Sequence, residues 1–118
     1  MINVISINPQ HIDHHTVIDL PITSHTHNVY AVEWSGQKVG YIIVNLNRGD
    51  YWIEHFYVQE SCRNLKIGQT LLNACIRDYN TIYLIVSKTN YKAIHMFKKC
   101  NFETTGHFRN YLKMKKTL

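Results

Sequence analysis

The sequence predicts an α/β fold with a mixed, mostly antiparallel and twisted sheet, and three observations indicate it. Strand-like segments dominate both ends of the chain, and two helix-like segments lie between residues 67 and 101. Tight turns separate most neighbouring strands. Over residues 51–87 a strand, an amphipathic helix and an apolar strand follow one another, and such a unit makes its two strands parallel through a right-handed crossover. We expect residues 1–118 to form one domain, since this length supports a single core.

The first half of the chain contains four predicted strands. The first is apolar and stops at Pro9, and residues 10–27 form either a short helix or an irregular packed segment. Two turns that each contain a glycine, at residues 35–37 and 48–50, separate the next three strands. The four predicted strands cover residues 1–8, 28–34, 38–47 and 51–59.

The second half alternates helices and strands. Helical spacing of apolar residues predicts a helix from Ile67 to Tyr79, and the continuous apolar run at residues 81–87 is typical of a buried strand. Thr89 or Asn90 caps a second helix that ends at Asn101. The closing hairpin is predicted to turn at Gly106-His107, with strands at residues 102–106 and 108–114.

Charge is distributed unevenly along the chain. Residues 1–62 hold two Lys/Arg against six Asp/Glu, whereas residues 63–118 hold eleven against two. Such a split indicates that the second half handles an anion. No apolar run is long enough to span a membrane, the first residues lack the pattern of a signal peptide, and the three cysteines lack metal-ligand spacing. We therefore expect a cytoplasmic protein without a membrane partner.

The most informative stretch is residues 58–72. It is predicted to contain the end of a strand, a polar turn with Arg63 and Gly68, and the start of an amphipathic helix. The first amides of a helix lack partners within the helix and carry partial positive charge, so such a turn makes an anion site. We expect this turn to hold a pyrophosphate.

These residues resemble the GNAT superfamily of acyl-CoA N-acyltransferases. The family's main motif is a strand that ends in Val, then Arg, a glycine-containing turn and a Leu-rich helix. Its second motif is an Asn that opens the last helix, followed by Ala, an aromatic residue and Gly-Phe. The matching residues here are Val58, Arg63, Ile67, Gly68, Leu71 and Leu72 for the first motif, and Asn90, Ala93, Phe97 and Phe102 for the second.

The resemblance implies a small GNAT-like domain with a shortened N-terminal region and with acetyl-CoA as its acyl donor substrate. It implies transfer of an acetyl group, by direct attack, to a primary amine of a peptide, protein or small molecule. The alternative is an acyl-CoA-binding regulatory or protein-interaction module with little or no turnover. Nucleic-acid binding is the weakest reading, because a coenzyme A site explains the same positive charge.

The resemblance also implies which residues contact coenzyme A. Backbone groups of residues 56–58 would meet the pantetheine arm where their strand separates from its neighbour. Lys66 stands where the family usually has its first motif glycine, so its side chain either blocks the phosphates or adds an ion pair. Asn64 and Asn101 also replace frequent glycines, and Asn tolerates a left-handed backbone best among non-Gly residues. The cofactor-binding set is Phe56, Tyr57, Val58, Arg63, Asn64, Leu65, Lys66, Ile67, Gly68, Gln69, Asn90 and Phe97.

Glu54 is the candidate catalytic base, since family members often carry an acid near this strand position. Period-two alternation places Glu54 on the same side as Trp52, Phe56 and Val58, with His55 on the opposite side. In the alternative, Glu54 faces solvent or takes part in a salt bridge.

Phe97 occupies the position of the family's usual Tyr acid and has no proton to give. Either the thiolate leaves without an acid, or Tyr91 or Tyr111 substitutes, or the protein binds acyl-CoA without turning it over.

The segment before residue 28 leaves two further questions. The family normally places two helices there, and a shorter wall favours either an open site that takes a peptide or protein amine, or a homodimer that completes the pocket. Several histidines fall in this segment, but their spacing does not predict a zinc site, and we expect no metal. These histidines are His11, His14, His15, His25 and His27.

Overall fold

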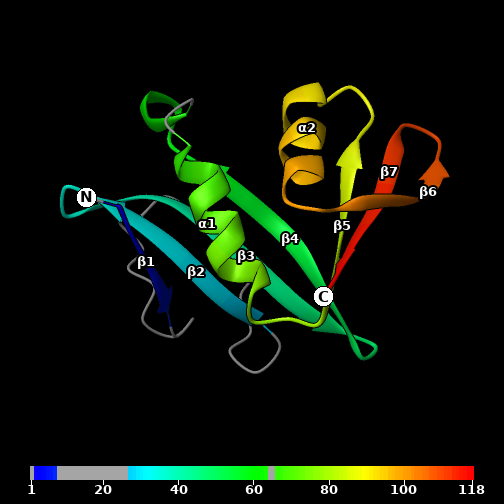
Figure 1. Cartoon of the computed structure of the whole chain (residues 1–118), viewed down its shortest axis with the longest axis horizontal. Helices are drawn as coiled ribbons and strands as arrows, with labels where there is room; N and C mark the ends of the chain where they lie inside the picture. The colour runs from blue at the N-terminus through cyan, green and yellow to red at the C-terminus, as the bar shows by residue number, and fades with distance from the viewer. Residues whose placement is uncertain (1, 8–26, 64–65) are drawn as a thin grey trace.

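A computed structural model describes residues 2–7, 27–63 and 66–118. Within these residues, seven strands form one sheet in the order β1-β2-β3-β4-β5-β7-β6, and all neighbours are antiparallel except the parallel pair β4–β5 (Figure 1). This confirms the predicted fold class. The strands are β1 (Ile2–Ile7), β2 (His27–Trp34), β3 (Gln37–Asn47), β4 (Asp50–Val58), β5 (Thr81–Ser87), β6 (Glu103–Phe108) and β7 (Tyr111–Thr117); the helices are α1 (Ile67–Ile76), α2 (Tyr91–Lys99) and a 3₁₀ turn at Glu60–Cys62.

Both hairpin turns of the first half have the geometry that a tight β-hairpin requires. Ser35 and Gly36 join β2 to β3 with φ of 54° and 79°, and Arg48 and Gly49 join β3 to β4 with φ of 52° and 85°. Two consecutive residues with positive φ match the twist of antiparallel strands. The predicted turns are therefore confirmed.

Two predicted boundaries are wrong. α1 ends at Ile76 rather than Tyr79, because the amides of Asp78 and Tyr79 bond back three residues, to the carbonyls of Cys75 and Ile76, and tighten the chain into a turn. The last hairpin turns after Phe108 rather than at Gly106, which instead lies inside β6 beside a break in its pairing with β7. A glycine inside a strand often marks such an irregularity.

One face of the sheet packs against both helices (Figure 1). Side chains from α1, α2 and the central strands form a single buried cluster on that side, because alternate strand residues point to the same face. Its most enclosed members include Ile42, Leu71, Leu72, Leu84 and Met114. No helix in the described ranges is long and apolar enough to cross a membrane.

An asparagine caps each end of α2, Asn90 through its side chain and Asn101 through its backbone. The Asn90 side-chain oxygen accepts a hydrogen bond from the Ala93 amide at 3.3 Å. At the other end Asn101 takes φ 70°, and the Phe102 amide donates to the Phe97 carbonyl at 3.0 Å. This closure pairs the last helical carbonyls and packs the Phe97 and Phe102 rings, with centroids 5.6 Å apart. Asn101 thus fills the usual glycine position in the left-handed conformation that was predicted for it.

A cluster of tyrosines holds the C-terminal end of α1 against β2. The Tyr30 hydroxyl donates to the Asp78 carboxylate at 2.7 Å and lies 3.0 Å from the Tyr79 hydroxyl, which also accepts from Asn28 Nδ2 at 3.0 Å. Burial, and then the hydrogen bonds to Tyr79 and Asp78, raise the pKa of Tyr30 well above its ordinary value of 10.0. The cluster therefore stabilises the fold only while Tyr30 is protonated.

We expect Tyr30→Phe to lower the free energy of unfolding at pH 7 by about 1–2 kcal/mol, because Asp78 loses a buried donor. The wild type should also lose stability above about pH 10, where the unfolded chain releases the Tyr30 proton and the folded chain retains it. In the variant this alkaline loss should be smaller. Urea unfolding between pH 7 and pH 11 measures both effects, and equal alkaline slopes in the two proteins would contradict the argument.

Candidate active site

β4 and β5 run together for only two residue pairs before they separate. Trp52 pairs with Tyr83 and Ile53 with Leu84, although β4 continues to Val58 and β5 to Ser87. The two strands diverge toward the edge at which both α1 and α2 begin (Figure 1). The backbone edge of residues 56–58 that faces β5 therefore has no ladder partner there, as predicted.

A cleft of about 700 Å³ occupies this separation and continues between the two helices. Its volume lies in the range of small-molecule and cofactor sites. The structure brings most of the predicted site residues to its walls. These residues are Glu54, Phe56, Tyr57, Val58, Arg63, Lys66, Gly68, Gln69, Asn90 and Phe97.

Three predicted site residues are not placed in the cleft. Ile67 is only 1% exposed and its side chain packs in the core, because it lies on the buried face of α1. A contact through its backbone amide stays a prediction. Asn64 and Leu65 lie outside the described residues.

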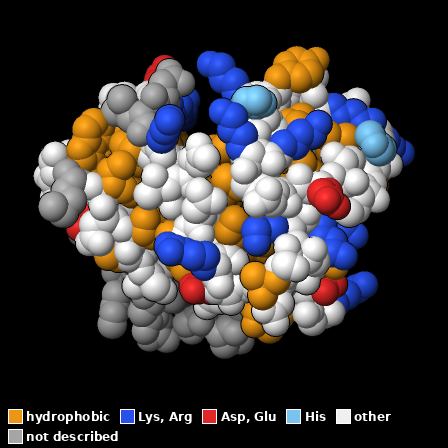
Figure 2. Space-filling model, viewed as in Figure 1, with side chains coloured by type: hydrophobic (Ala, Val, Ile, Leu, Met, Phe, Trp, Pro, Cys, Tyr) orange, Lys and Arg blue, Asp and Glu red, His pale blue; other side chains and the backbone are white. Residues whose placement is uncertain are grey.

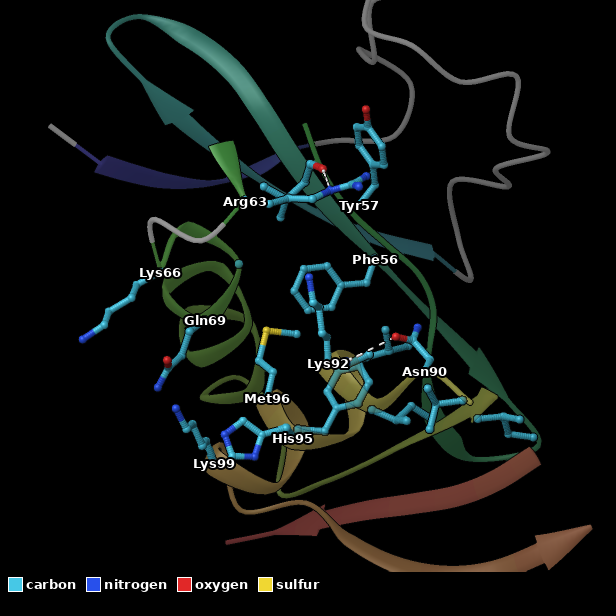
Figure 3. A pocket seen from close by; sticks show the side chains of 18 of the residues that line it. Phe56, Tyr57, Arg63, Lys66, Gln69, Asn90, Lys92, His95, Met96 and Lys99 are labelled. Carbon is cyan, nitrogen blue, oxygen red and sulfur yellow. Dashed lines mark hydrogen bonds between the residues drawn. The ribbon is translucent and has the colours of Figure 1, made fainter. Parts of the chain in front are cut away.

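One face of α2 contributes a group of cleft residues that are not in the predicted cofactor-binding set. Lys92, His95, Met96 and Lys99 line the cleft, and Figure 3 shows His95 and Lys99 opposite Lys66 and Gln69 of α1. Their spacing of three, four and seven residues places them on one helical face, and this pattern could have identified them. In the sequence of α2, the apolar spacing of the core face is a stronger signal than the mostly polar spacing of the cleft face.

The cleft between the helices is positively charged. Arg63, Lys66, Lys92 and Lys99 line it, and Glu54 is its only acidic lining residue among those described. Figure 2 shows Lys and Arg side chains gathered on this face around the gap between the helices. Four of the eleven basic residues after residue 62 therefore line this cleft, and their charge favours an anionic ligand.

Lys66, and not Gly68, has the left-handed backbone at the start of α1. Lys66 precedes α1 with φ 61° and ψ 13°, a left-handed conformation that costs a residue with a side chain about 1–2 kcal/mol. Gly68 has no positive φ and lies within the first turn of α1, so the turn does not require a glycine there. A Cβ at Gly68 would meet Val58 Cγ2 at 3.4 Å and Met96 Sδ at 3.6 Å. The glycine therefore keeps the cleft open where α1, α2 and β4 meet.

We expect Lys66→Gly to raise the free energy of unfolding by about 1 kcal/mol, because glycine adopts the left-handed conformation without steric cost. A thermal or urea unfolding curve measures this gain. The same change removes one positive charge from the cleft, so an accompanying loss of affinity for a polyphosphate ligand would identify Lys66 as a contact. Lys66→Ala serves as the control, since it removes the charge and keeps the strain. A destabilised Lys66→Gly would contradict the argument.

Arg63 holds the end of β4 to the loop that follows it. Its Nε donates to the Val58 carbonyl at 2.9 Å, and its guanidinium carbon lies 5.8 Å from the centre of the Tyr57 ring. These contacts indicate that Arg63 orders the loop after β4. The side chain also forms part of the cleft wall.

The predicted orientation of Glu54 is wrong in part. The pairing of β4 with β3 shifts between Val44–Ile53 and Ile43–His55, so Glu54 is an extra residue in the ladder. Its neighbours Trp52 and His55 occupy the face away from the helices, whereas Phe56 contacts the core. Simple alternation fails at such a bulge, because one residue is added without a partner. Glu54 and His55 consequently share a face, and Glu54 is opposite to Phe56 and Val58.

Two side chains from β2 and β3 hold the Glu54 carboxylate. Asn45 Nδ2 donates to Oε1 at 2.7 Å, and His27 Nε2 lies 3.3 Å from Oε2. The Glu54 side chain is 37% exposed, so the carboxylate remains accessible. Asn45 Oδ1 is buried and has no hydrogen-bond partner among the described residues.

Neither tyrosine suggested as a substitute acid is in the cleft. Tyr91 is 75% exposed on α2 and Tyr111 is 50% exposed on β7, and neither belongs to the cleft walls. Phe97 lies at the inner wall and packs on Phe56, with ring centroids 6.2 Å apart. Tyr57 is therefore the only tyrosine among the described lining residues.

Most of the His-rich segment lies outside the described residues. His11, His14, His15 and His25 lie outside the described residues, and His27 contacts Glu54. In the described part of the chain, no three His, Cys, Asp or Glu side chains group as metal ligands would. The predicted helix or packed segment at 10–27 likewise lies almost wholly outside it.

Comparison with known proteins defines the class. Residues 6–102 match the Acetyltransferase (GNAT) family. The chain therefore belongs to the GNAT acetyltransferase family. No curated protein matches the chain.

Solved structures share the fold at low sequence identity. An IAA acetyltransferase from Bacillus cereus ATCC 14579 has a TM-score of 0.82 at 13% identity, covering 100% of both chains. The ribosomal-protein-S18-alanine N-acetyltransferase from Escherichia coli has a TM-score of 0.79 at 15% identity, covering 99% of this chain and 94% of that one. The PaiA N-acetyltransferase from Thermoplasma acidophilum, in complex with coenzyme A, has a TM-score of 0.71 at 16% identity, covering 79% of this chain and 62% of that one.

Proposed function

We propose that this protein transfers the acetyl group of acetyl-CoA to a primary amine of a peptide, protein or small molecule by direct attack. The observation that carries the proposal is a single cleft with two chemically different ends. Basic side chains and the start of α1 line one end, and Glu54 lines the other, where β4 and β5 separate. Family membership supports acetyl transfer, and a structural neighbour that contains coenzyme A supports the donor.

In this proposal coenzyme A binds along the cleft. Its pyrophosphate meets the first amides of α1 beside Gly68, where unpaired N–H groups and the helix dipole favour an anion. Lys66, Lys92 and Lys99 lie close enough to the same cleft to attract its phosphates. The pantetheine amides bond to backbone groups of residues 56–58 on the edge where β4 has separated from β5, in the manner of an added strand.

Glu54 acts as the base at the other end of the cleft. The attacking amine must be neutral, so its proton passes to the carboxylate directly or through one water molecule. Asn45 and His27 keep the carboxylate in place. The N–C bond forms as the C–S bond breaks, and the amide and free coenzyme A are the products.

The departing thiolate takes its proton from solvent, because Phe97 cannot supply one. The thiol of coenzyme A has an acidity close to that of cysteine, with a pKa of about 8.5, so it can leave as an anion. General acid catalysis is worth roughly 10²–10⁴-fold in rate, so we expect a slow enzyme rather than an inactive one.

Two measurements test the proposal. Calorimetry should show acetyl-CoA binding, and a thiol-release assay across amines, peptides and proteins should show turnover with at least one acceptor class. The second candidate, an acyl-CoA-binding module, is favoured by Phe97 alone. Binding without thiol release from any acceptor would select that second function, and absence of binding would overturn both. A cytoplasmic location is part of the proposal, and the free, buried state of all three cysteines supports it.

A further inference from the structure

The sheet face opposite the helices carries an exposed surface that the proposed chemistry does not use. We define this open sheet face by the side chains that point away from the helices on β4, β5 and β7. Trp52 and Tyr83 stack there, with ring centroids 4.9 Å apart and planes inclined by 28°. The other members are Ile85, Tyr111, Lys113 and Lys115.

This surface is both apolar and positively charged. Ile85 is 46% exposed and Tyr111 is 50% exposed, so large apolar surface is accessible on this face. The Lys113 Nζ lies 5.4 Å from the centre of the Trp52 ring and 5.0 Å from that of Tyr83. Neither Lys113 nor Lys115 has a carboxylate within ion-pair distance among the described residues. Two cations that rest on aromatic rings are thus available to an anionic group.

The open sheet face adjoins the reactive end of the cleft. The bulge in β4 turns Glu54 toward this face, and both Glu54 and Ile85 line the cleft. On the helix side of the cleft, Phe56 and Phe97 pack against the core and line the part that we propose for coenzyme A. An amine that approaches Glu54 from the other side of the sheet therefore crosses the face that carries Trp52, Tyr83 and Lys113.

We infer that the acceptor is a polypeptide amine with a carboxylate side chain two or three residues away, bound across the open sheet face. The inference rests on the proposed function and narrows its acceptor class. An exposed shelf gives a small amine little to contact, whereas an extended peptide can cover it. Lys113 lies on the strand next to β5, roughly 5–10 Å from the cleft at one to two strand spacings. An extended chain spans that distance in two or three residues.

The test uses two six-residue peptides with free amino termini. One carries glutamate at its third and fourth positions, and the other carries glutamine there. With acetyl-CoA, the wild type should acetylate the glutamate peptide with a kcat/KM about three- to fivefold higher, the size expected of exposed ion pairs. The preference should fade in 1 M salt, where charges are screened beyond about 3 Å. Binding of the labelled peptides in the presence of free coenzyme A should show the same order and needs no turnover.

Lys113→Glu should reverse the peptide preference and leave the affinity for acetyl-CoA unchanged. Lys38→Glu, at the exposed start of β3, is the control with the same charge change, and it should keep the wild-type order. Equal treatment of the two peptides by the wild type would overturn the inference while acetyl-CoA binding still supports the proposed function. So would a dimer that Ile85→Asp dissociates, or binding of single-stranded RNA that Lys113→Glu abolishes without any peptide preference. Failure of acetyl-CoA to bind would instead overturn the proposed function itself.

Discussion

Replacing Glu54 with Gln is expected to lower kcat for acetyl transfer by about 100-fold or more, the usual worth of a positioned base. Gln keeps the shape of Glu54 and can still bond to Asn45, so the fold and the cleft should persist. It cannot accept the proton of the attacking amine. The variant should therefore depend on amine that has already lost its proton in solution, and its rate should rise steeply with pH until the amine is deprotonated.

The measurement is the pH profile of thiol release by the wild type and the variant, with the KM for acetyl-CoA as a check on the donor site. Glu33→Gln on β2 removes a carboxylate elsewhere on the sheet and is the matched control. A kcat within twofold of the wild type would remove Glu54 from the role of base. In that case His55, which lies on the same face of β4 as Glu54, would become the candidate base.

Gly68→Asp is expected to weaken acetyl-CoA binding by about 100-fold or more. The carboxylate would point into the cleft between Val58 and Met96, where a like charge beside a phosphate costs several kcal/mol. The fold should tolerate the change, because the new Cβ makes only ordinary contacts and an acidic residue in the first turn of α1 complements the helix dipole. Loss of binding should therefore occur without loss of stability.

Calorimetry with coenzyme A and an unfolding curve for each variant separate these effects. Gly68→Asn has the size of the aspartate without its charge, so the difference between the two variants measures electrostatic repulsion alone. Gly68→Ala should fall nearest the wild type in affinity. If the aspartate and asparagine variants bind equally well, the start of α1 is not where the phosphates lie.

Much of the fold was predictable from local patterns. The order of strands and helices, the two early hairpin turns and the parallel pair β4–β5 follow from apolar periodicity and from glycines at turns. Asn101 is an example: it stands where the family often has glycine, Asn tolerates a left-handed backbone best among non-Gly residues, and the structure gives Asn101 that backbone. Local chemistry decides these features, so a short stretch of sequence contains enough information.

The exact ends of elements depended on contacts from distant parts of the chain. Tyr79 has the helical spacing of α1, yet it lies in a turn in which its hydroxyl meets Tyr30 of β2. Gly106 looked like a hairpin turn, but β6 continues through it and pairs with β7. In both places tertiary packing outweighs the local preference.

What the sequence by itself determined is the composition of the site: a strand end, a basic loop and a helix start, together with a second helix opened by Asn90. Only the tertiary structure decided how these parts face one another. The β4 bulge places Glu54 on the open sheet face. The left-handed backbone lies at Lys66 and not at Gly68. The packing of α2 beside α1 places Lys92 and Lys99 in the cleft wall. The physical reason is that an inserted residue in a ladder, and the placement of one helix beside another, depend on long-range packing. The inserted residue leaves no local signature in the chain, and the spacing of the α2 residues shows only that they share a helical face.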